Sequence, residues 1–270
     1  MSFRRLGRPM SQTREIASRV VEHDRGMIQE SQYDFPYHHL PHFDSEGVPA
    51  ITRSLTWGYE YLCYLQHLAD SIRELRPASV IDVGCGDGAL LGLLANSGIQ
   101  ITGVEKSTRA IAFARAFYPE LDFRCLDAQE LHETFDVVVA SEVLEHVPDN
   151  QVSSFIQMLG GLVNPFGHVI ITVPTRNVPL NPKHYRHYDE ELIMQTIHES
   201  GSSLKVIDVY YVFKRTVVYN LLRRLSCNSH WSINSAIARR FVWRYVWNRA
   251  RHAPAHDGCH MVVYLRPEGN

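Results

Sequence analysis

The stretch Val80-Ile81-Asp82-Val83-Gly84-Cys85-Gly86-Asp87-Gly88 decides the fold of this chain. Its apolar, β-branched start predicts a strand, its glycines predict a tight turn, and the apolar run Ala89 to Leu94 predicts a helix. Glycines let the backbone turn sharply and approach a ligand, and a helix N-terminus offers free N–H groups. Because Gly84, Gly86 and Ala89 also satisfy the relaxed dinucleotide fingerprint, the loop by itself leaves NAD open as a ligand.

Length and composition describe an ordinary globular chain. The 270 residues are 45% hydrophobic and 21% charged, with a formal net charge of −2. These values predict one sizeable core. The small net charge gives no overall electrostatic field that would attract nucleic acid or a membrane. The five cysteines form no CxxC pair, which favours reduced thiols and a cytoplasmic location. The sequence contains no signal-peptide pattern and no apolar run of membrane-spanning length.

Strand and helix patterns alternate along most of the chain. Beside the strand and helix around the glycine loop, the predicted strands cover residues 100–105, 121–125, 135–140, 168–173, 204–212 and 258–265. The predicted helices cover residues 54–75, 109–117, 149–162 and 189–199. The run at 135–140 is nearly continuous in apolar residues, as expected for a parallel strand buried on both faces. The alternation predicts an α/β fold with a doubly wound, mostly parallel sheet.

The first 76 residues are expected to form a helical or lid region in front of the main domain at 77–270. Residues 14–29 have helical character. Residues 33–43 carry aromatics, histidines and two prolines, and form either an arm over the edge of the core or a substrate lid. Trp57 and Tyr61, in the helix predicted at 54–75, either face a ligand or belong to the core.

Three carboxylates lie in or directly after predicted strands. Glu105 comes about 20 residues after the first glycine, where a carboxylate can accept hydrogen bonds from both ribose hydroxyls. Asp127 either accepts from an adenine amino group or caps a turn. Asp82, together with Asp87, would be unfavourable beside a pyrophosphate and favourable beside a cationic amino or sulfonium group. The set therefore favours an amino-acid-bearing adenosine over NAD.

Four segments in this order resemble the class I S-adenosylmethionine-dependent methyltransferases: 80–88, Glu105, Leu126-Asp127-Ala128 and the run 135–149. The resemblance covers about residues 78–212 and a last strand near 260. It implies a Rossmann-like, seven-stranded sheet whose one antiparallel strand is the final segment. It also implies that the first two glycines approach the methionine portion, that Glu105 binds ribose and Asp127 binds adenine, and that Ser141 lies beside the methyl donor. The expected cofactor-binding residues are Asp82, Gly84, Cys85, Gly86, Glu105, Lys106, Asp127, Ala128 and Ser141.

The segment Glu142-Val143-Leu144-Glu145-His146 carries two carboxylates and an imidazole. One helical turn would present all three on one face, and such a set suits Mg²⁺ or Mn²⁺, with a fourth ligand from His184 or His187. The segment is similar to the ExxEH pattern of metal-assisted methyltransferases that act on RNA 3′-terminal 2′-hydroxyls or on quinone catechols. Similar sequences also occur in relatives without a metal, where the histidine packs or acts as a base. The predicted metal ligands are Glu142, Glu145, His146 and His187.

His146, His184 and His187 are the predicted catalytic bases, because imidazole can deprotonate a hydroxyl near neutral pH. The last two follow the strand predicted at 168–173, where the resemblance implies a substrate-facing loop. The expected activity is O-methylation of a small-molecule or sugar/glycan-type acceptor. The alternatives are a metal-dependent RNA 2′-O-methyltransferase, which the net charge does not favour, and a non-catalytic cofactor-binding scaffold.

Residues 213–256 interrupt the alternation. They hold nine lysines and arginines, no acidic residue and several interleaved aromatics. One interpretation is a helical pair that packs its apolar side chains onto the body. Those side chains are Leu221, Leu222, Leu225, Ile233, Ile237 and Phe241. The other interpretations are capture of a phosphorylated or nucleic-acid substrate, docking on an anionic membrane surface, and dimerisation.

Overall fold

The computed structural model describes residues 58–226 and 235–268, together with residues 25, 27, 42–43 and 47–50. Most of the predicted N-terminal helix, most of the segment 33–43 and Trp57 lie outside the described residues. Arg25 donates a hydrogen bond to the carbonyl oxygen of His184 at 2.6 Å and lies over the ring of Tyr185. Arg25 therefore contacts the loop that carries one of the predicted bases.

The secondary structure follows the predicted alternation closely. The strands are β1 (His42–Phe43), β2 (Pro49–Ala50), β3 (Ser79–Val83), β4 (Gln100–Glu105), β5 (Asp122–Cys125), β6 (Phe135–Ser141), β7 (Val163–Pro174), β8 (Leu204–Lys214), β9 (His252–Ala253) and β10 (Gly258–Pro267). The helices are α2 (Gly58–Glu74), α3 (Ala89–Leu94), α4 (Thr108–Phe117), α5 (Val152–Leu162), α6 (Glu190–Glu199), α7 (Val217–Ser226) and α8 (Ala236–Tyr245).

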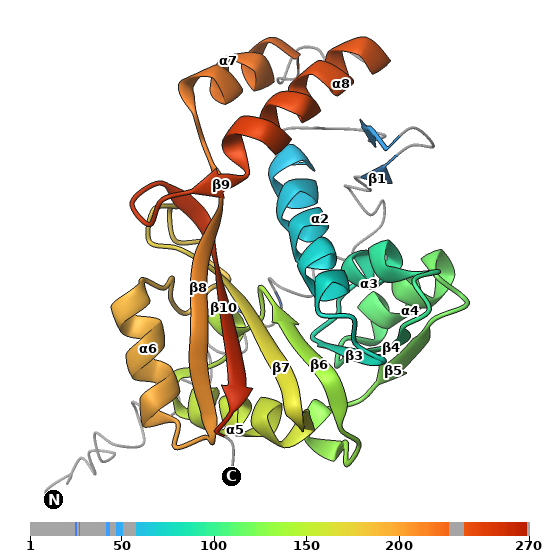
Figure 1. Ribbon diagram of the computed structural model, residues 1–270, viewed down its shortest axis with the longest axis vertical. Coiled ribbons are helices and arrows are strands. Elements are labelled where there is room, and N and C mark those ends of the chain that lie inside the picture. Colours follow the sequence, from blue (N-terminus) through green and yellow to red (C-terminus); the bar gives the residue numbers. More distant parts are fainter. Residues whose placement is uncertain are drawn as a thin grey trace, which may run out of the picture.

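Eight strands form one sheet in the order β5-β4-β3-β6-β7-β10-β8-β9 (Figure 1). Strands β3 to β7 run parallel, and β10 is antiparallel to both of its neighbours. The predicted Rossmann-like fold with an antiparallel final strand is confirmed. The predicted count of seven strands is one short, because β9 pairs only two residues with β8 and so short a strand leaves no periodic pattern in the sequence.

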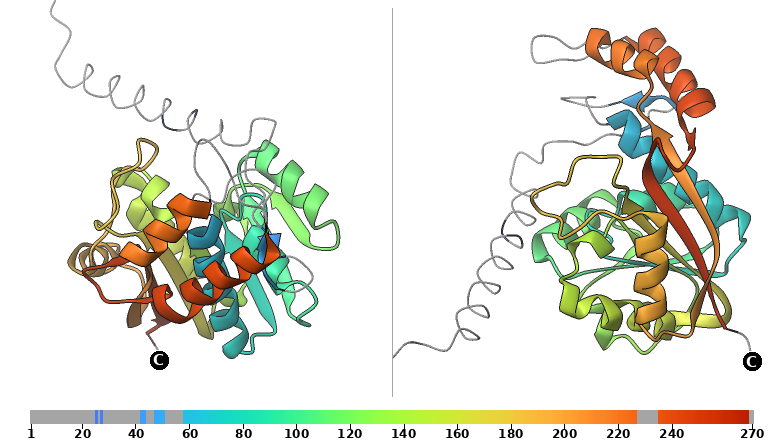
Figure 2. Two further views of the ribbon diagram at one scale, coloured as in Figure 1. Left: turned by 90° about the horizontal axis from the view of Figure 1, so that it is seen from above. Right: turned by 90° about the vertical axis from the view of Figure 1, so that its left-hand side faces the viewer.

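Helices cover both faces of the sheet (Figures 1 and 2). Side chains of α2, α3 and α4 form one core with one face of the strands, and α5 and α6 form the other core with the opposite face. On β3 the neighbouring residues Val80 and Ile81 belong to different cores, since successive strand side chains point to opposite faces. This burial on both faces explains why the strands are continuously apolar.

The order of the strands reverses beside β3. The chain passes from β3 outward to β4 and β5, and then returns to β6 on the other side of β3. In such sheets the carboxyl ends of the two strands at the reversal leave a crevice for ligands. The glycine loop, Glu105 and Ser141 all lie at these strand ends.

The helices α7 and α8 form a pair at one end of the sheet (Figure 1, top). The predicted packing of this pair is wrong for four side chains, because the opposite helix faces contact the body. Leu221, Leu225, Ile237 and Phe241 are 55%, 55%, 80% and 63% exposed. Between residues 217 and 250, the buried side chains among those that the structure describes are Tyr219, Val242, Val246 and Ala250. Leu222 is partly buried against the core, and Ile233 lies outside the described residues.

Candidate active site

A cavity of about 780 Å³ lies at the carboxyl ends of the parallel strands. One part of its wall comes from the glycine loop and the ends of β4 and β5: Val83, Gly84, Cys85, Gly86, Asp87, Glu105, Lys106, Asp127 and Ala128. Another part carries titratable side chains from segments far apart in the sequence: Glu60, Tyr64, Glu142, Glu145, His146, Lys183, His184, Arg215 and His260. The two parts meet near Ser141, at the end of β6. The cavity thus joins the predicted cofactor-binding residues to a wall rich in acids and bases.

Backbone geometry requires glycine at the start of the loop. Gly84 has a φ of +79°, and a Cβ atom there would lie 2.6 Å from Cγ2 of Val143. Its amide donates to the carbonyl oxygen of Val104 at 2.7 Å, which ties the loop to the end of β4. A larger residue would therefore strain the backbone and push the chain after β6 away from the loop.

Glu105 connects the glycine loop to helix α4. Its Oε1 accepts from the amide of Ser107 at 2.8 Å, and its Oε2 accepts from the amide of Gly86 at 3.4 Å. The carboxylate also lines the cavity, so it lies where a ribose would be expected in this kind of crevice. Ribose binding by Glu105 stays a prediction.

Asp127 caps a short turn and also lines the cavity. Its Oδ1 accepts from the amide of Gln129 at 3.1 Å, and its Oδ2 forms an ion pair with Lys106 at 2.8 Å. The capping role is therefore present in the structure. It does not conflict with an adenine contact, since a carboxylate has about four acceptor sites. The adenine role of Asp127 stays a prediction.

Asp82 is buried beside the glycine loop without lining the cavity itself. Burial, and then the charges of Glu105 and Asp87, raise the pKa of its carboxyl group to about 8. The Oδ1 atom has no hydrogen-bond partner within the described protein. A cationic ligand group in the neighbouring loop would favour the ionised form, so the residue fits the predicted preference for an amino or sulfonium ligand.

Glu142 departs from the predicted helical turn. Its φ of +56° breaks the helical geometry, and the 3₁₀ turn begins only at Leu144. The amide of Glu142 donates to the carbonyl oxygen of Thr172 at 3.0 Å. The prediction that Glu142 shares one helical face with Glu145 and His146 is therefore wrong.

The carboxylate of Glu142 lies instead beside His260, on β10. Oε1 of Glu142 is 3.3 Å from Nδ1 of His260, and Oε1 of Glu60 is 3.5 Å from Nε2 on the other side of the ring. The imidazole stacks on Tyr64 with ring centroids 4.5 Å apart, and Arg215 donates to Glu60 at 3.1 Å. Burial by itself would lower the pKa of His260, but the two carboxylates outweigh burial and raise it to about 10.

Glu60, Tyr64, Arg215 and His260 are cavity residues that the sequence did not reveal. They come from α2, from the residue after β8 and from β10, with no shared spacing. The register of the sheet brings them together, since His260 pairs with Pro174 at the carboxyl end of β7. The available signal was a histidine in an otherwise apolar final strand.

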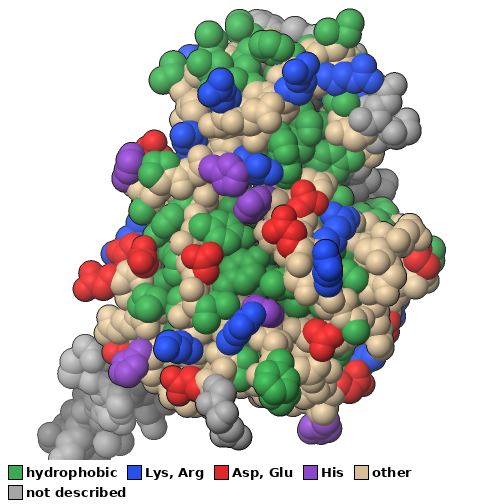
Figure 3. Space-filling view, viewed as in Figure 1, with side chains coloured by type: hydrophobic (Ala, Val, Ile, Leu, Met, Phe, Trp, Pro, Cys, Tyr) green, Lys and Arg blue, Asp and Glu red, His purple; other side chains and the backbone are tan. Residues whose placement is uncertain are grey.

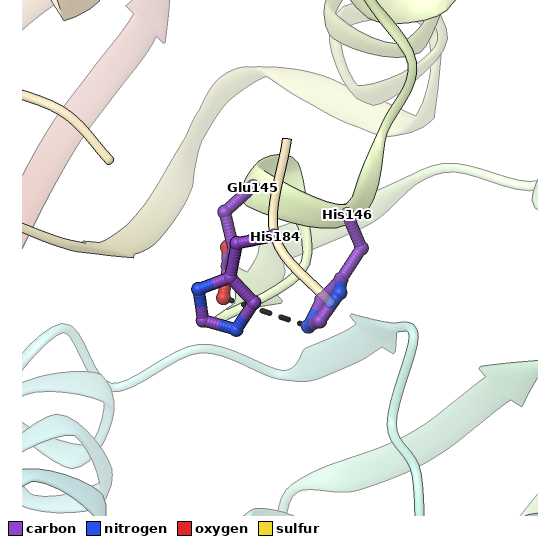
Figure 4. Close-up of side chains that lie close together, drawn as sticks. All are labelled: Glu145, His146 and His184. Carbon is purple, nitrogen blue, oxygen red and sulfur yellow. Dashed lines mark ion pairs between the residues drawn. The ribbon is translucent and has the colours of Figure 1, made fainter. Parts of the chain in front are cut away.

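The imidazole of His146 lies beside Glu145 and His184 (Figure 4). Its Nδ1 lies 3.2 Å from the carbonyl oxygen of Lys183, so Nδ1–H is the donor and Nε2 carries the free electron pair. Burial, and then the charge of Lys183, lower the pKa of the imidazole to about 4. His146 is therefore uncharged at neutral pH, and its Nε2 lies 3.8 Å from Oε1 of Glu145.

His184 and His187 form a hydrogen-bonded pair. His187 donates through Nδ1 to the carbonyl oxygen of Val178 at 3.1 Å and accepts through Nε2 from Nδ1 of His184 at 2.8 Å. Burial, and then His146 and Lys183, lower the pKa of His184 to about 3. His184 lines the cavity, whereas His187 does not. His187 is therefore placed to orient His184 rather than to contact an acceptor.

The four predicted metal ligands do not come together. In the described part of the chain, the ligand atoms of Glu145, His146 and His184 lie within 4.8 Å of one another (Figure 4). Glu142 contacts His260 instead, and both ring nitrogens of His187 are engaged. One carboxyl and two imidazoles differ from the oxygen-rich set that Mg²⁺ takes. Burial, and then the charge of Glu142, raise the pKa of the Glu145 carboxyl group well above its usual value.

The doubly wound sheet with its antiparallel β10, the glycine loop at its reversal and the carboxylate at the end of β4 fit the class I S-adenosylmethionine-dependent methyltransferases. The family model described as "Methyltransferase domain" matches residues 59–212. This chain belongs to that family.

Relatives with assigned activities match part of the chain. The ubiquinone biosynthesis O-methyltransferase of Azorhizobium caulinodans is 39% identical over 119 residues, which cover 42% of this chain and 46% of that protein. The enzyme of the same name from Stutzerimonas stutzeri is 39% identical over 120 residues, covering 42% and 49%. This chain spans about half the length of the curated relatives it matches.

Solved structures share the fold at low sequence identity. Magnesium protoporphyrin IX methyltransferase from Synechocystis PCC 6803 with bound SAM has a TM-score of 0.51 at 15% identity, covering 80% of this chain and 85% of that chain. The [4+2]-cyclase SpnF has a TM-score of 0.52 at 21% identity, covering 76% and 82%. These similarities show the fold alone, and none of the comparisons supports a bound metal.

Proposed function

We propose that this protein transfers a methyl group from S-adenosylmethionine to a hydroxyl oxygen of a small-molecule acceptor. The observation that carries the proposal is the cavity itself, which joins the glycine loop and Glu105 to the neutral imidazoles of His146 and His184. The O-methyltransferase activity of the relatives supports oxygen as the acceptor atom. Because those relatives act in ubiquinone biosynthesis, an aromatic hydroxyl is the first acceptor class to test, ahead of a sugar or glycan hydroxyl.

The residues around the glycine loop fit the cosubstrate by their chemistry. Glu105 and Asp127 offer carboxylates for ribose hydroxyls and an adenine amino group, and the buried Asp82 favours a nearby cation. Gly84 and Gly86 leave room for close approach of a ligand to the backbone. Cys85, Lys106, Ala128 and Ser141 complete the wall on this side.

Bound S-adenosylmethionine supplies an electrophilic methyl group on a sulfonium centre. For transfer, the cavity wall would hold the acceptor oxygen in line with the carbon–sulfur bond that breaks, which is the main requirement for this reaction. Nε2 of His146 accepts the hydroxyl proton as the oxygen–carbon bond forms, and the electron pair of the carbon–sulfur bond stays on sulfur. The products are a methyl ether, S-adenosylhomocysteine and an imidazolium that returns its proton to water.

Transfer of a labelled methyl group tests the proposal. The protein is incubated with labelled S-adenosylmethionine and either a dihydroxybenzoate or a fractionated cell extract. Label in the small-molecule fraction is expected, and label confined to RNA or protein would contradict the proposed acceptor class. His146→Ala should lower the rate by about 100-fold or more. His198→Ala, at an exposed position in the last turn of α6, is the matched control.

The rate of His146→Ala tests the role of this residue as a base, whereas the labelled fraction tests the class of acceptor. A wild-type rate in His146→Ala would refute the role of His146 as base while leaving methyl transfer in place. If no fraction receives label while S-adenosylhomocysteine binds in calorimetry, the protein would be a cofactor-binding scaffold instead.

A further inference from the structure

Six apolar side chains on α7 and α8 face away from the rest of the protein. On α7 they recur at helical spacing along one exposed face, and on α8 two more lie one turn apart. These six side chains, called the apolar patch below, are Val217, Val218, Leu221, Leu225, Ile237 and Phe241. Isolated exposed apolar residues need no explanation, but a cluster on two adjacent helices marks a contact surface.

Exposed arginines border the apolar patch. Arg240 and Arg244 each follow an apolar patch residue of α8 by three positions, so they lie on the same side of that helix. Arg224 is exposed near the end of α7. No acidic residue occurs between positions 213 and 256. Figure 3 shows apolar and basic side chains together at this end of the molecule.

The opposite faces of the two helices fix their orientation. Tyr219 of α7 and Val242 of α8 are 1% and 3% exposed and belong to the core shared with α2. Arg215, just before α7, forms two hydrogen bonds of 3.1 Å with Glu60 on α2. The apolar patch is therefore held in place on a folded support.

We propose that the apolar patch and its arginines dock on the surface of an anionic phospholipid bilayer. A bilayer surface satisfies both kinds of side chain, since the acyl boundary takes the apolar ones and lipid phosphates take the guanidinium groups. Nucleic acid would leave the apolar patch in water. A second copy would bring like-charged arginines together with no carboxylate in the segment to pair with them. Among the described residues, no helix has the length and apolar character to cross a membrane.

The docked helices would lie next to the active-site cavity. Arg215 lines that cavity and stands two positions before the first residue of the apolar patch. An acceptor that partitions into the bilayer would thus enter beside the membrane surface. This statement about the acceptor rests on the proposed function, whereas docking itself does not.

Cosedimentation of the full chain with vesicles tests the docking. Phosphatidylcholine vesicles with and without phosphatidylserine serve as probes, at low and high salt. Binding is expected only with phosphatidylserine, and it should weaken as salt rises. The double variants Leu221→Ser with Phe241→Ser, and Arg240→Glu with Arg244→Glu, should each lower the vesicle affinity by more than about tenfold. Phe166→Ser is the matched control, because Phe166 is 96% exposed on β7 outside the apolar patch.

Binding of S-adenosylhomocysteine in calorimetry shows that each variant is folded, and it should not change. Equal binding to neutral and anionic vesicles, or wild-type binding by both double variants, would overturn the proposal. Absence of vesicle binding together with a dimer that the double variants disrupt would assign the apolar patch to a second copy. Absence of vesicle binding together with RNA binding that the arginine variant abolishes would assign the surface to nucleic acid. Neither vesicle result depends on finding the methyl acceptor, so the two proposals can fail separately.

Discussion

Nδ1 of His260 lies 3.3 Å from Oε1 of Glu142, and this contact joins the last strand of the sheet to the segment after β6. With Glu60 on its other side, His260 has a raised pKa, whereas the pKa values of His146 and His184 are lowered. One cavity wall therefore holds a charged imidazole and two neutral ones at neutral pH. The neutral pair keeps ring nitrogens without a proton, and the charged ring holds two carboxylates in place.

Glu142→Gln should lower the pKa of His260 from about 10 toward its ordinary value of 6.5, because the nearer carboxylate is lost. In the wild type, the ion pair between Glu142 and protonated His260 stabilises the fold, and this contribution is complete below pH 6.5. That contribution is lost as the pH rises toward 10, by at most about 1.4 kcal/mol per pH unit. Between pH 6.5 and pH 10, the free energy of unfolding should therefore fall less steeply with rising pH in Glu142→Gln than in the wild type.

NMR titration of the His260 ring and urea unfolding across this pH range measure both effects. Glu191→Gln is the control, since Glu191 is exposed in the first turn of α6. An unchanged His260 titration in Glu142→Gln would show that Glu142 does not set the charge of this ring.

Gly84→Ala should destabilise the protein by about 2 to 4 kcal/mol and weaken binding of S-adenosylhomocysteine. The new Cβ would meet Val143 at 2.6 Å in a backbone with a φ of +79°. Gly98→Ala is a matched control, because Gly98 has a φ of +78° but open space around it. It should cost only about 1 to 2 kcal/mol. Urea unfolding measures the stability of Gly84→Ala and Gly98→Ala, and calorimetry measures their binding of S-adenosylhomocysteine. Equal losses of stability in the two variants would show that the contact with Val143 does not matter.

The sequence predicts those parts of the site that depend on local pattern. The strand, turn and helix around Gly84 follow from β-branched residues and glycines, and Glu105 follows from its position at a strand end. The positive φ of Glu142 has no such signal, since non-glycine residues rarely adopt it. His260 reaches the cavity only through strand pairing with β7, which a local pattern cannot reveal.

The buried faces of α7 and α8 could not be predicted from the sequence either. Helix α8 carries apolar side chains on more than one face, so its periodicity does not say which face is buried. The aliphatic side chains of α7 gather on one face, which periodicity predicts to be buried, yet most of them are exposed. The buried face contains Tyr219 and Val242, whereas Leu221 and Phe241 are exposed. The choice depends on the shape of the surface formed by α2 and β8, which is assembled from distant parts of the chain.

Asp82→Asn should make the stability less dependent on pH. The pKa of Asp82 is raised from 3.8 to about 8 in the folded protein, so between these values the unfolded state loses a proton that the folded state keeps. The free energy of unfolding therefore falls as the pH rises through this range, by at most about 1.4 kcal/mol per pH unit. Asparagine resembles the protonated acid and should remove this loss. Thermal unfolding at several pH values measures it.

Asp82→Asn also tests whether Asp82 favours a cationic group of the ligand. Binding of S-adenosylhomocysteine should release a proton from wild-type Asp82, because the amino group of the ligand favours the carboxylate. Calorimetry in two buffers with different ionisation enthalpies detects that proton, and Asp82→Asn should lose both the release and part of the affinity. Asp208→Asn, exposed on β8, is the control. Equal proton release by Asp82→Asn and the wild type would refute the assignment.

Chelation of divalent cations should leave methyl transfer unchanged. Among the described residues, the cluster of Glu145, His146 and His184 offers one carboxyl and two imidazoles, a set poor in the oxygen ligands that Mg²⁺ takes. His146 can take the hydroxyl proton by itself, so the reaction needs no ion to activate the acceptor. The measurement is turnover before and after dialysis against EDTA. Loss of turnover that Mn²⁺ restores in the wild type but not in Glu145→Gln would show instead that this cluster binds a metal during the reaction.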